Sequence, residues 1–142
     1  MKHFSRIYTQ NDLRSVVQEI IQSCKDVQII TLQGSLGAGK TTLAIELLEQ
    51  LGVQGEKQSP TYTYMQIYTN QSGKNFYHFD LYRLPDKQAF LFAGFDEFLY
   101  QPNALVLIEW PAIINDLLDH AVCSIDIEYI DDKTRKIDWQ IK

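Results

Sequence analysis

Residues 34–42 read Gly34-Ser35-Leu36-Gly37-Ala38-Gly39-Lys40-Thr41-Thr42, and this stretch decides how the chain folds. It matches the pattern G-x-x-x-x-G-K-S/T at every fixed position. The preceding residues, 27–32, are mostly aliphatic and predict a buried strand, and leucines recur at helical spacing from Leu43 to Leu51. A strand, a glycine-rich turn and a helix therefore follow one another, which is the arrangement of a phosphate-binding loop.

The residue types in this loop suit the binding of a nucleoside triphosphate. Its glycines let backbone N–H groups curl round an anion, and the start of the following helix adds the positive end of its dipole. Lys40 is predicted to reach the β- and γ-phosphates, and the Thr41 hydroxyl to bind Mg²⁺. All of residues 34–42 are candidate nucleotide contacts. The competing interpretation is a turn that only joins a strand to a helix, and the flanking elements disfavour it.

Composition limits the class of protein. The chain has 142 residues, of which 45% are hydrophobic, so we expect a single globular domain over 1–142. Its net charge of −5 disfavours binding of nucleic acid by this chain alone. The two cysteines lack metal-ligand spacing and are compatible with a reducing compartment. With no signal-like start and no membrane-length apolar run, we expect a cytoplasmic protein.

The loop motif and the hydrophobic patterning together predict an α/β protein with a P-loop NTPase-like three-layer fold around a central mixed β-sheet. Two β-rich pairs of segments flank turn-like residues 70–74 and 131–134, and each pair predicts an antiparallel hairpin. The residues 9–12 have the spacing of a capping box before a helix. Further strands are expected at 5–8, 62–68, 75–82, 104–108, 122–130 and 135–141, and further helices at 13–21, 85–92 and 113–118.

Glu109 is the first acidic candidate for chemistry. It ends the most apolar run of the chain, 104–108, and ligands of open α/β sheets lie at the carboxyl ends of strands. Phosphate-loop enzymes keep an acid there that helps to hold Mg²⁺. The alternative is a solvated charge at the end of a strand. The acids Asp96, Asp116 and Asp119 are weaker candidates because none of them ends an apolar strand.

Asp80 is the second acidic candidate. Alternation along its strand places His78, Asp80 and Tyr82 on one face, which is either solvated or directed at the nucleotide. Thr61 is either a switch-loop residue that offers a hydroxyl to Mg²⁺ or the γ-phosphate, or an ordinary turn threonine. For Trp110, a packing role, an adenine contact and an interface role all remain open.

Four stretches together resemble one family. They are Leu36–Thr42, Ser59–Tyr62, His78–Leu84 and Ile108–Pro111, and their order and separations also match. The chain resembles the TsaE (YjeE) family, the ATPase subunit of bacterial tRNA threonylcarbamoyladenosine biosynthesis. The loop alone would indicate only a superfamily, whereas its combination with H-F-D-L-Y-R and I-E-W-P is far more specific.

The resemblance implies an ATPase that acts with the TsaB–TsaD threonylcarbamoyl transferase complex and supports its repeated turnover. ATP and Mg²⁺ are the implied cofactors, and tRNA would be reached only through the complex, with no role for DNA or a membrane. We expect slow hydrolysis by the chain alone and stimulation by its partners. By match, Lys40, Asp80 and Glu109 are catalytic candidates, Thr41 and Glu109 are metal candidates, and Thr61 and Trp110 join the loop around the nucleotide.

Two other functions are weighed against this one. A small-molecule kinase would need an acceptor pocket and a lid that is usually rich in arginine, and residues 85–101 contain no arginine. A nucleotide-dependent binding module without useful turnover is disfavoured by the two acids. GTP is a less expected substrate because the chain has no N-K-x-D motif.

Overall fold

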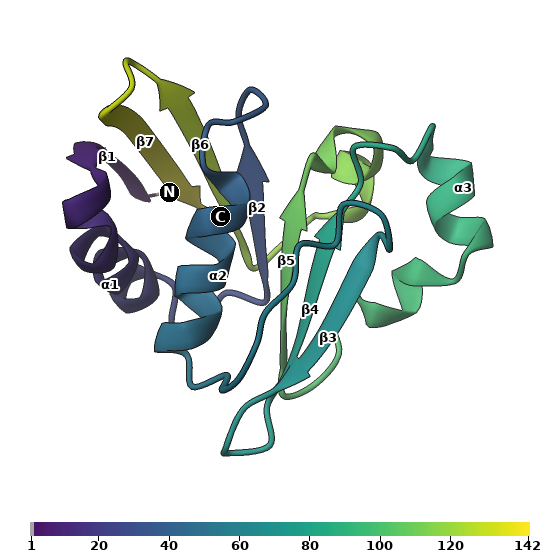
Figure 1. The fold of residues 1–142 in the computed structure, drawn as a ribbon. Helices are drawn as coiled ribbons and strands as arrows, with labels where there is room; N and C mark the ends of the chain where they lie inside the picture. Colours follow the sequence, from purple (N-terminus) through teal and green to yellow (C-terminus); the bar gives the residue numbers. More distant parts are fainter. Residues whose placement is uncertain (1) are drawn as a thin grey trace.

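The computed structural model describes residues 2–142, whose strands form one seven-stranded sheet in the order β1-β7-β6-β2-β5-β4-β3 (Figure 1). Strands β6, β2, β5 and β4 are mutually parallel, whereas β7 pairs antiparallel with β6 and β1, and β3 pairs antiparallel with β4. The predicted mixed sheet and both predicted hairpins are confirmed. The strands are β1 (Lys2–Thr9), β2 (Ile29–Gln33), β3 (Met65–Thr69), β4 (Asn75–Asp80), β5 (Ala104–Glu109), β6 (Val122–Tyr129) and β7 (Thr134–Ile141).

Helices cover both faces of this sheet and complete a three-layer α/β fold (Figure 1). Helices α1 and α2 pack on one face, while α3, η2 and η3 pack on the other. None of the helices in residues 2–142 is long and apolar enough to span a membrane. The α-helices are α1 (Leu13–Ser23), α2 (Lys40–Gln50) and α3 (Lys87–Phe92), and the 3₁₀ helices are η1 (Gln10–Asp12), η2 (Phe95–Phe98) and η3 (Pro111–Leu117).

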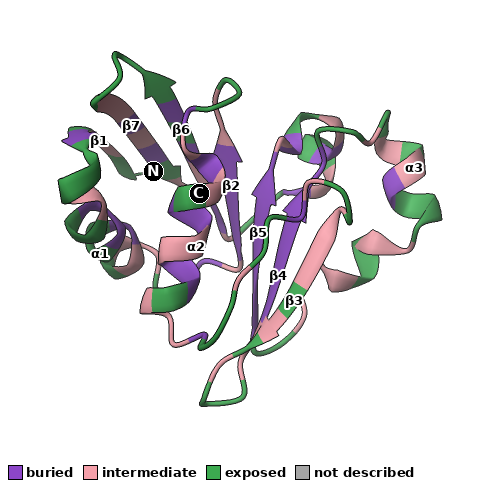
Figure 2. Ribbon diagram, viewed as in Figure 1, coloured by how far each residue is buried: buried purple, intermediate pink, exposed green. Residues whose placement is uncertain are grey.

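The central strands are buried on both faces, which explains their apolar sequences (Figure 2). Every residue of β5 is buried, including Glu109 at its end. Along β4, Phe79 packs toward α3, while Phe76 packs toward the face that carries α1 and α2. His78 and Asp80 are buried polar residues of the same strand. A buried polar side chain is costly unless it is hydrogen-bonded, so the ends of β4 and β5 call for a functional explanation.

Local signals explain where the first two helices begin and end. The Thr9 backbone N–H and hydroxyl both donate to Asp12 Oδ2 at 3.0 Å, so the predicted capping box is confirmed before α1. Helix α2 ends at Gln50, and Gly52 just beyond it has a φ of +94°, in the left-handed region that glycine adopts readily.

Three sequence predictions of local structure are wrong in detail. The strand expected at 62–68 begins only at Met65, because residues 60–64 form a turn closed by the Tyr64 N–H donating to the Pro60 carbonyl at 2.8 Å. Strand β4 ends at Asp80, which leaves Tyr82 outside it. The helix expected at 113–118 is the 3₁₀ helix η3, interrupted by non-helical angles at Ile114. So short an apolar segment takes its conformation from packing on the sheet, not from helix propensity.

Candidate functional site

The candidate site lies at the carboxyl ends of β2, β4 and β5. Residues 34–39 connect β2 to α2, and glycines 34, 37 and 39 have φ values of +154°, +78° and +107°. A Cβ on Gly34 would lie 2.4 Å from the Ile127 carbonyl oxygen, so a larger residue would push the loop away from β6. Glycine is therefore required here both by backbone conformation and by space.

Lys40 folds back over this loop and keeps its charge inside the site. Its Nζ donates to the Gly34 carbonyl at 2.6 Å and to the Ser35 carbonyl at 2.8 Å, and the residue is only 5% exposed. Burial lowers the pKa of the Lys40 amine from its ordinary value, and the carboxylates of Glu109 and Asp80 oppose that shift. The cation is thus placed between the loop backbone and two acids.

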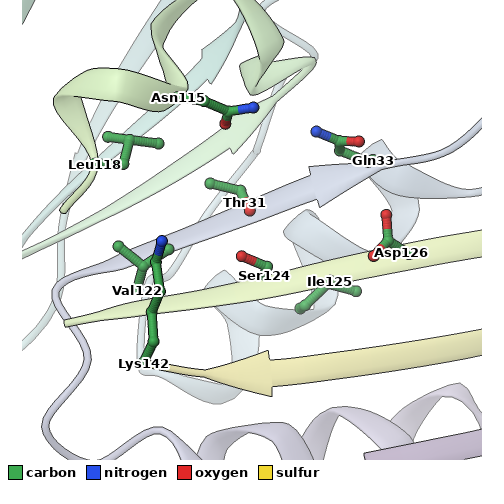
Figure 3. A pocket seen from close by; sticks show the side chains of 9 residues that line it. All are labelled: Thr31, Gln33, Asn115, Leu118, Val122, Ser124, Ile125, Asp126 and Lys142. Atoms are coloured by element: carbon green, nitrogen blue, oxygen red, sulfur yellow. The ribbon is translucent and has the colours of Figure 1, made fainter. Parts of the chain in front are cut away.

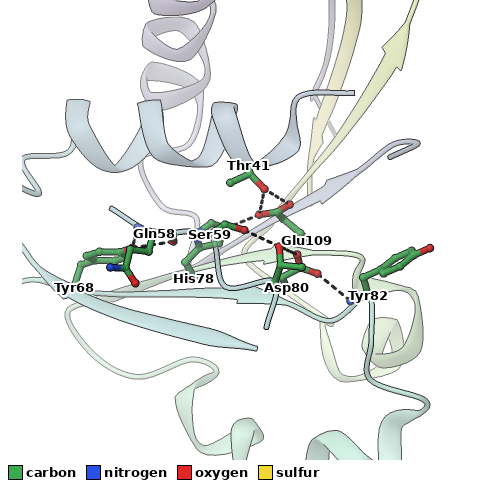
Figure 4. Close-up of polar contacts among 9 residues, drawn as sticks. Thr41, Gln58, Ser59, Tyr68, His78, Asp80, Tyr82 and Glu109 are labelled. Atoms are coloured by element: carbon green, nitrogen blue, oxygen red, sulfur yellow. Dashed lines mark hydrogen bonds and ion pairs between the residues drawn. The ribbon is translucent and has the colours of Figure 1, made fainter. Parts of the chain in front are cut away.

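A buried chain of hydrogen bonds joins α2, β5 and β4 (Figure 4). The Thr41 hydroxyl lies 2.8 and 3.0 Å from the two carboxylate oxygens of Glu109 and donates to this group. The His78 Nε2 lies 2.7 Å from Glu109 Oε2, and a carboxylate only accepts, so Nε2 carries the proton. Among residues 2–142, the His78 Nδ1 has no hydrogen-bond partner. The Glu109 carboxylate is thereby fixed from two sides at the mouth of the loop.

Asp80 pairs directly with Glu109 in the register of β4 and β5. Its Oδ1 accepts from the Tyr82 backbone N–H at 3.0 Å, and its Oδ2 accepts from the Thr61 hydroxyl at 3.2 Å. The Ser59 hydroxyl in turn lies 2.7 Å from the Thr61 hydroxyl. Asp80 therefore connects the segment 58–64 to the end of its strand.

Trp110 follows Glu109 and forms a wall of the same site. Its φ of +60° turns the chain immediately after β5, and its backbone N–H donates to the Leu32 carbonyl at 3.2 Å. Lys40 Nζ lies 4.0 Å from the centroid of the Trp110 ring, within cation–π range. The Tyr82 ring packs against the Trp110 ring, with the two ring centroids 4.8 Å apart.

A cavity of about 280 Å³ lies between the loop, the acids and this tryptophan. The structure brings together the predicted catalytic, metal and switch-loop residues around it, although they come from four separate parts of the sequence. The side chain of Leu36 lies exposed at its rim, whereas that of Ala38 is buried in the core beneath the loop. Its lining includes Lys40, Thr41, Thr61, Asp80, Glu109 and Trp110.

A larger cavity of about 550 Å³ adjoins the same loop. It shares Gly37, Gly39 and Thr42 with the smaller cavity, and its other walls come from residues 8–13 and from the β6–β7 hairpin. Sequence reasoning did not single out these wall residues, because they lie far from the loop in sequence and belong to no motif. The signals in them, the polar run 9–12 and the turn-like residues 131–134, indicated a helix start and a hairpin turn.

A third cavity of about 320 Å³ lies between β2, β6 and η3, on the face of the sheet opposite to α1 and α2 (Figure 3). Its polar lining includes Thr31, Asn115 and Ser124, and it contains none of the predicted site residues. It is therefore separate from the candidate site.

The residues of the site fit a phosphate group and a Mg²⁺ ion. The glycine conformations leave room for an anion against the loop backbone. The Thr41 hydroxyl and the Glu109 carboxylate supply oxygen donors side by side, and Mg²⁺ prefers oxygen ligands. Within residues 2–142 no group of three or more His, Cys, Asp or Glu side chains could hold a metal ion. A site of one or two protein ligands completed by phosphates is the usual arrangement for Mg²⁺.

Several known proteins that are similar to this chain belong to one family. The family model described as "Threonylcarbamoyl adenosine biosynthesis protein TsaE" matches residues 7–137. The chain is 42% identical to the TsaE protein of Haemophilus influenzae over 104 residues, which cover 73% of this chain and 65% of that protein, slightly less than two thirds. It is 31% identical to the TsaE protein of Bacillus subtilis over 132 residues, 93% of this chain and 81% of that protein.

A solved structure also resembles this fold. The crystal structure of YdiB from Bacillus subtilis superposes with a TM-score of 0.73 and 26% sequence identity, covering 97% of this chain and 84% of that one.

Proposed function

The chain belongs to the TsaE family of threonylcarbamoyl adenosine biosynthesis proteins, and from this membership we propose that it is a Mg²⁺-dependent ATPase subunit that acts with the TsaB–TsaD complex. One observation supports the proposal above the others. Glu109 is buried at the mouth of the loop 34–39 and accepts hydrogen bonds from both Thr41 and His78. A carboxylate so placed, beside the hydroxyl of the loop, is suited to hold a metal ion on a bound triphosphate.

The two cavities beside the loop suggest how ATP lies across it. Only the smaller cavity contains the two acids, so we assign it to the terminal phosphate. The larger cavity has about 550 Å³ and no buried acid, so we assign it to the adenosine. Thr42 and two loop glycines line both cavities, and they are assigned to the phosphates in between.

Each polar residue has a distinct role in the proposed hydrolysis. Lys40 would supply positive charge to the phosphates, and Thr41 and Glu109 would hold the Mg²⁺ ion. When bound, that ion supplies further charge neutralisation for the phosphates. Asp80, opposite Glu109, is assigned to orient the attacking water. His78 keeps the Glu109 carboxylate in place through its Nε2–H and does not contact the nucleotide.

The segment 58–64 is the proposed link between the nucleotide and the partner proteins. Thr61 reaches the cavity and is bonded to Asp80, while the neighbouring Tyr62 is exposed. The Tyr68 hydroxyl holds the start of the segment, at 3.0 Å from the Gln58 nitrogen and 3.2 Å from its carbonyl oxygen. A terminal phosphate that contacts Thr61 can order such a segment, and hydrolysis can release it.

The link predicts that TsaB–TsaD binds the ATP state of this protein better than the other states. Its affinity should be highest with a non-hydrolysable ATP analogue and lower with ADP or without nucleotide. By linkage, the partner complex should tighten ATP binding by the same factor. The affinity of TsaB–TsaD for each of the three states can be measured by calorimetry or by surface plasmon resonance. Three affinities that agree within error would rule out the switch.

Glu109→Gln should weaken binding of an ATP analogue in Mg²⁺ by about tenfold or more, and weaken binding in EDTA much less. Glutamine has the size of glutamate and can still contact Thr41 and His78, but it is a weak Mg²⁺ ligand. Glu128→Gln is the control, because Glu128 is an exposed acid on β6. The test is to titrate the parent and both variants with the ATP analogue, once in Mg²⁺ and once in EDTA, and to compare the affinities. Identical Mg²⁺ dependence in the parent and Glu109→Gln would remove Glu109 from the metal site.

The proposed function itself is tested by measuring ATP hydrolysis. We expect slow Mg²⁺-dependent turnover by the isolated protein and faster turnover when TsaB–TsaD is added. Weak tRNA binding by the isolated protein is also expected, because its net charge is −5. Absence of turnover with and without the partners would leave a binding module. Transfer of the phosphoryl group to a small molecule would indicate a kinase instead.

A further inference from the structure

Arg135, near the start of β7, reaches across to the phosphate-binding loop. Its Nε donates to the Ala38 carbonyl at 3.1 Å, and its Nη1 donates to the carbonyls of Asp131 at 2.6 Å and Thr134 at 3.1 Å. The Tyr129 ring centroid lies 4.6 Å from the guanidinium carbon. The guanidinium is therefore held by the β6–β7 hairpin while it contacts one carbonyl of the loop.

That carbonyl belongs to a peptide unit which the loop must keep in one orientation. In a planar trans peptide the C=O and the following N–H point in opposite directions, so the position of the Ala38 oxygen fixes the direction of the Gly39 N–H. Gly37 and Gly39 on either side adopt φ of +78° and +107°, and glycine changes its backbone angles easily. If the peptide turned over, a carbonyl oxygen would face the phosphates in place of an N–H donor.

One backbone donor of the loop is not free to contact an anion. The Ala38 N–H is already used inside it, donating to the Ser35 carbonyl at 3.1 Å. Buried anions in such loops depend on several backbone N–H groups acting together. From these contacts we infer that Arg135 is a positioning residue, which holds the Ala38 carbonyl outside the phosphate cradle so that the Gly39 N–H donates to the nucleotide phosphates.

This inference rests on the proposed nucleotide site and deepens it. Arg135 also lines the larger cavity, so a direct contact with the adenosine is the main alternative. The second alternative is a general contribution of its positive charge to anion binding. Inorganic tripolyphosphate tests the first alternative, because it has phosphates but no nucleoside that Arg135 could contact. A variant that loses the same charge at a distant position tests the second alternative.

The test compares Arg135→Gln with Arg14→Gln, which removes the same charge from an exposed position on α1. Dissociation constants for tripolyphosphate and for a non-hydrolysable ATP analogue are measured for both variants and the parent. Arg135→Gln should weaken both ligands by a similar factor, about tenfold, which is typical for loss of a charged hydrogen bond. Arg14→Gln should change neither by more than about twofold. Arg135→Lys keeps the charge without the fork of donors, so its affinities should fall between those of the parent and Arg135→Gln.

A nuclear magnetic resonance measurement on ¹⁵N-labelled protein reads the cradle directly. The Gly39 amide proton should shift downfield when tripolyphosphate binds to the parent, and should shift less in Arg135→Gln. If that variant does not fold, Arg135→Lys gives the same comparison.

The outcomes separate the inference from the function. Weakening of the ATP analogue alone would assign Arg135 to the nucleoside, and equal losses in Arg14→Gln would reduce its role to charge. Either result overturns the inference, as does an unchanged affinity in Arg135→Gln. A parent protein that binds neither ligand would overturn the proposed function, and this inference with it.

Discussion

Lys40→Ala is expected to abolish tight ATP binding and to lower ATP turnover by about a hundredfold or more, the usual effect of removing a preorganised group that stabilises charge. The Lys40 amine is held against the carbonyls of Gly34 and Ser35, with the Trp110 ring on one side. No other cationic side chain lines the cavity that contains the two acids within the described residues. Loss of this one charge would therefore leave the phosphates facing Asp80 and Glu109 with too little compensation.

The measurement is equilibrium binding of an ATP analogue together with steady-state turnover. Lys25→Ala is the control, because it removes a lysine from an exposed position after α1. A Lys40→Ala protein with the affinity and turnover of the parent would disprove the phosphate-loop interpretation of residues 34–42.

Asp80→Ala should have the second largest effect, a loss of about a hundredfold or more in turnover with ATP binding largely intact. Asp80 is 5% exposed, lines the cavity and accepts hydrogen bonds from Thr61 and from the Tyr82 backbone. A carboxylate there is suited to orient water at the terminal phosphate, which contributes to the reaction and little to binding. Turnover and binding are measured on the same preparation.

Asp80→Asn separates chemistry from structure at this position. Asparagine keeps the shape and can still accept from the Tyr82 N–H, so the fold should be kept while turnover is lost. Asp26→Ala, an exposed acid before β2, is the control. If binding and turnover fall by the same factor in Asp80→Ala while Asp80→Asn behaves as the parent, Asp80 has a purely structural role.

Local sequence was sufficient to predict the loop and the place of Glu109. The loop 34–42 is contiguous, and its flanking strand and helix have distinct periodicities. Glu109 could be placed because an acid directly after an all-apolar run must lie at the carboxyl end of a buried strand. The structure adds that β2, β4 and β5 are parallel, which brings their carboxyl ends to one edge of the sheet.

Contacts between distant segments could not be predicted in the same way. Alternation placed His78 on the face of Asp80, but its bond to Glu109 depends on the register of β4 against β5. His78 pairs with Leu107, so its ring reaches the diagonal neighbour two residues further along β5. Nothing in the sequence around Arg135 points to the loop, from which it is separated by 97 positions at its contact with Ala38.

The central claim is that residues 34–42 form a Mg²⁺-dependent ATP site. The most direct measurement is calorimetric titration of the unmodified protein with a non-hydrolysable ATP analogue, once in excess Mg²⁺ and once in EDTA. The account predicts saturable binding of one nucleotide per chain, tighter in Mg²⁺ than in EDTA. Absence of saturable binding in both conditions, or affinity for the analogue that Mg²⁺ leaves unchanged, would contradict it.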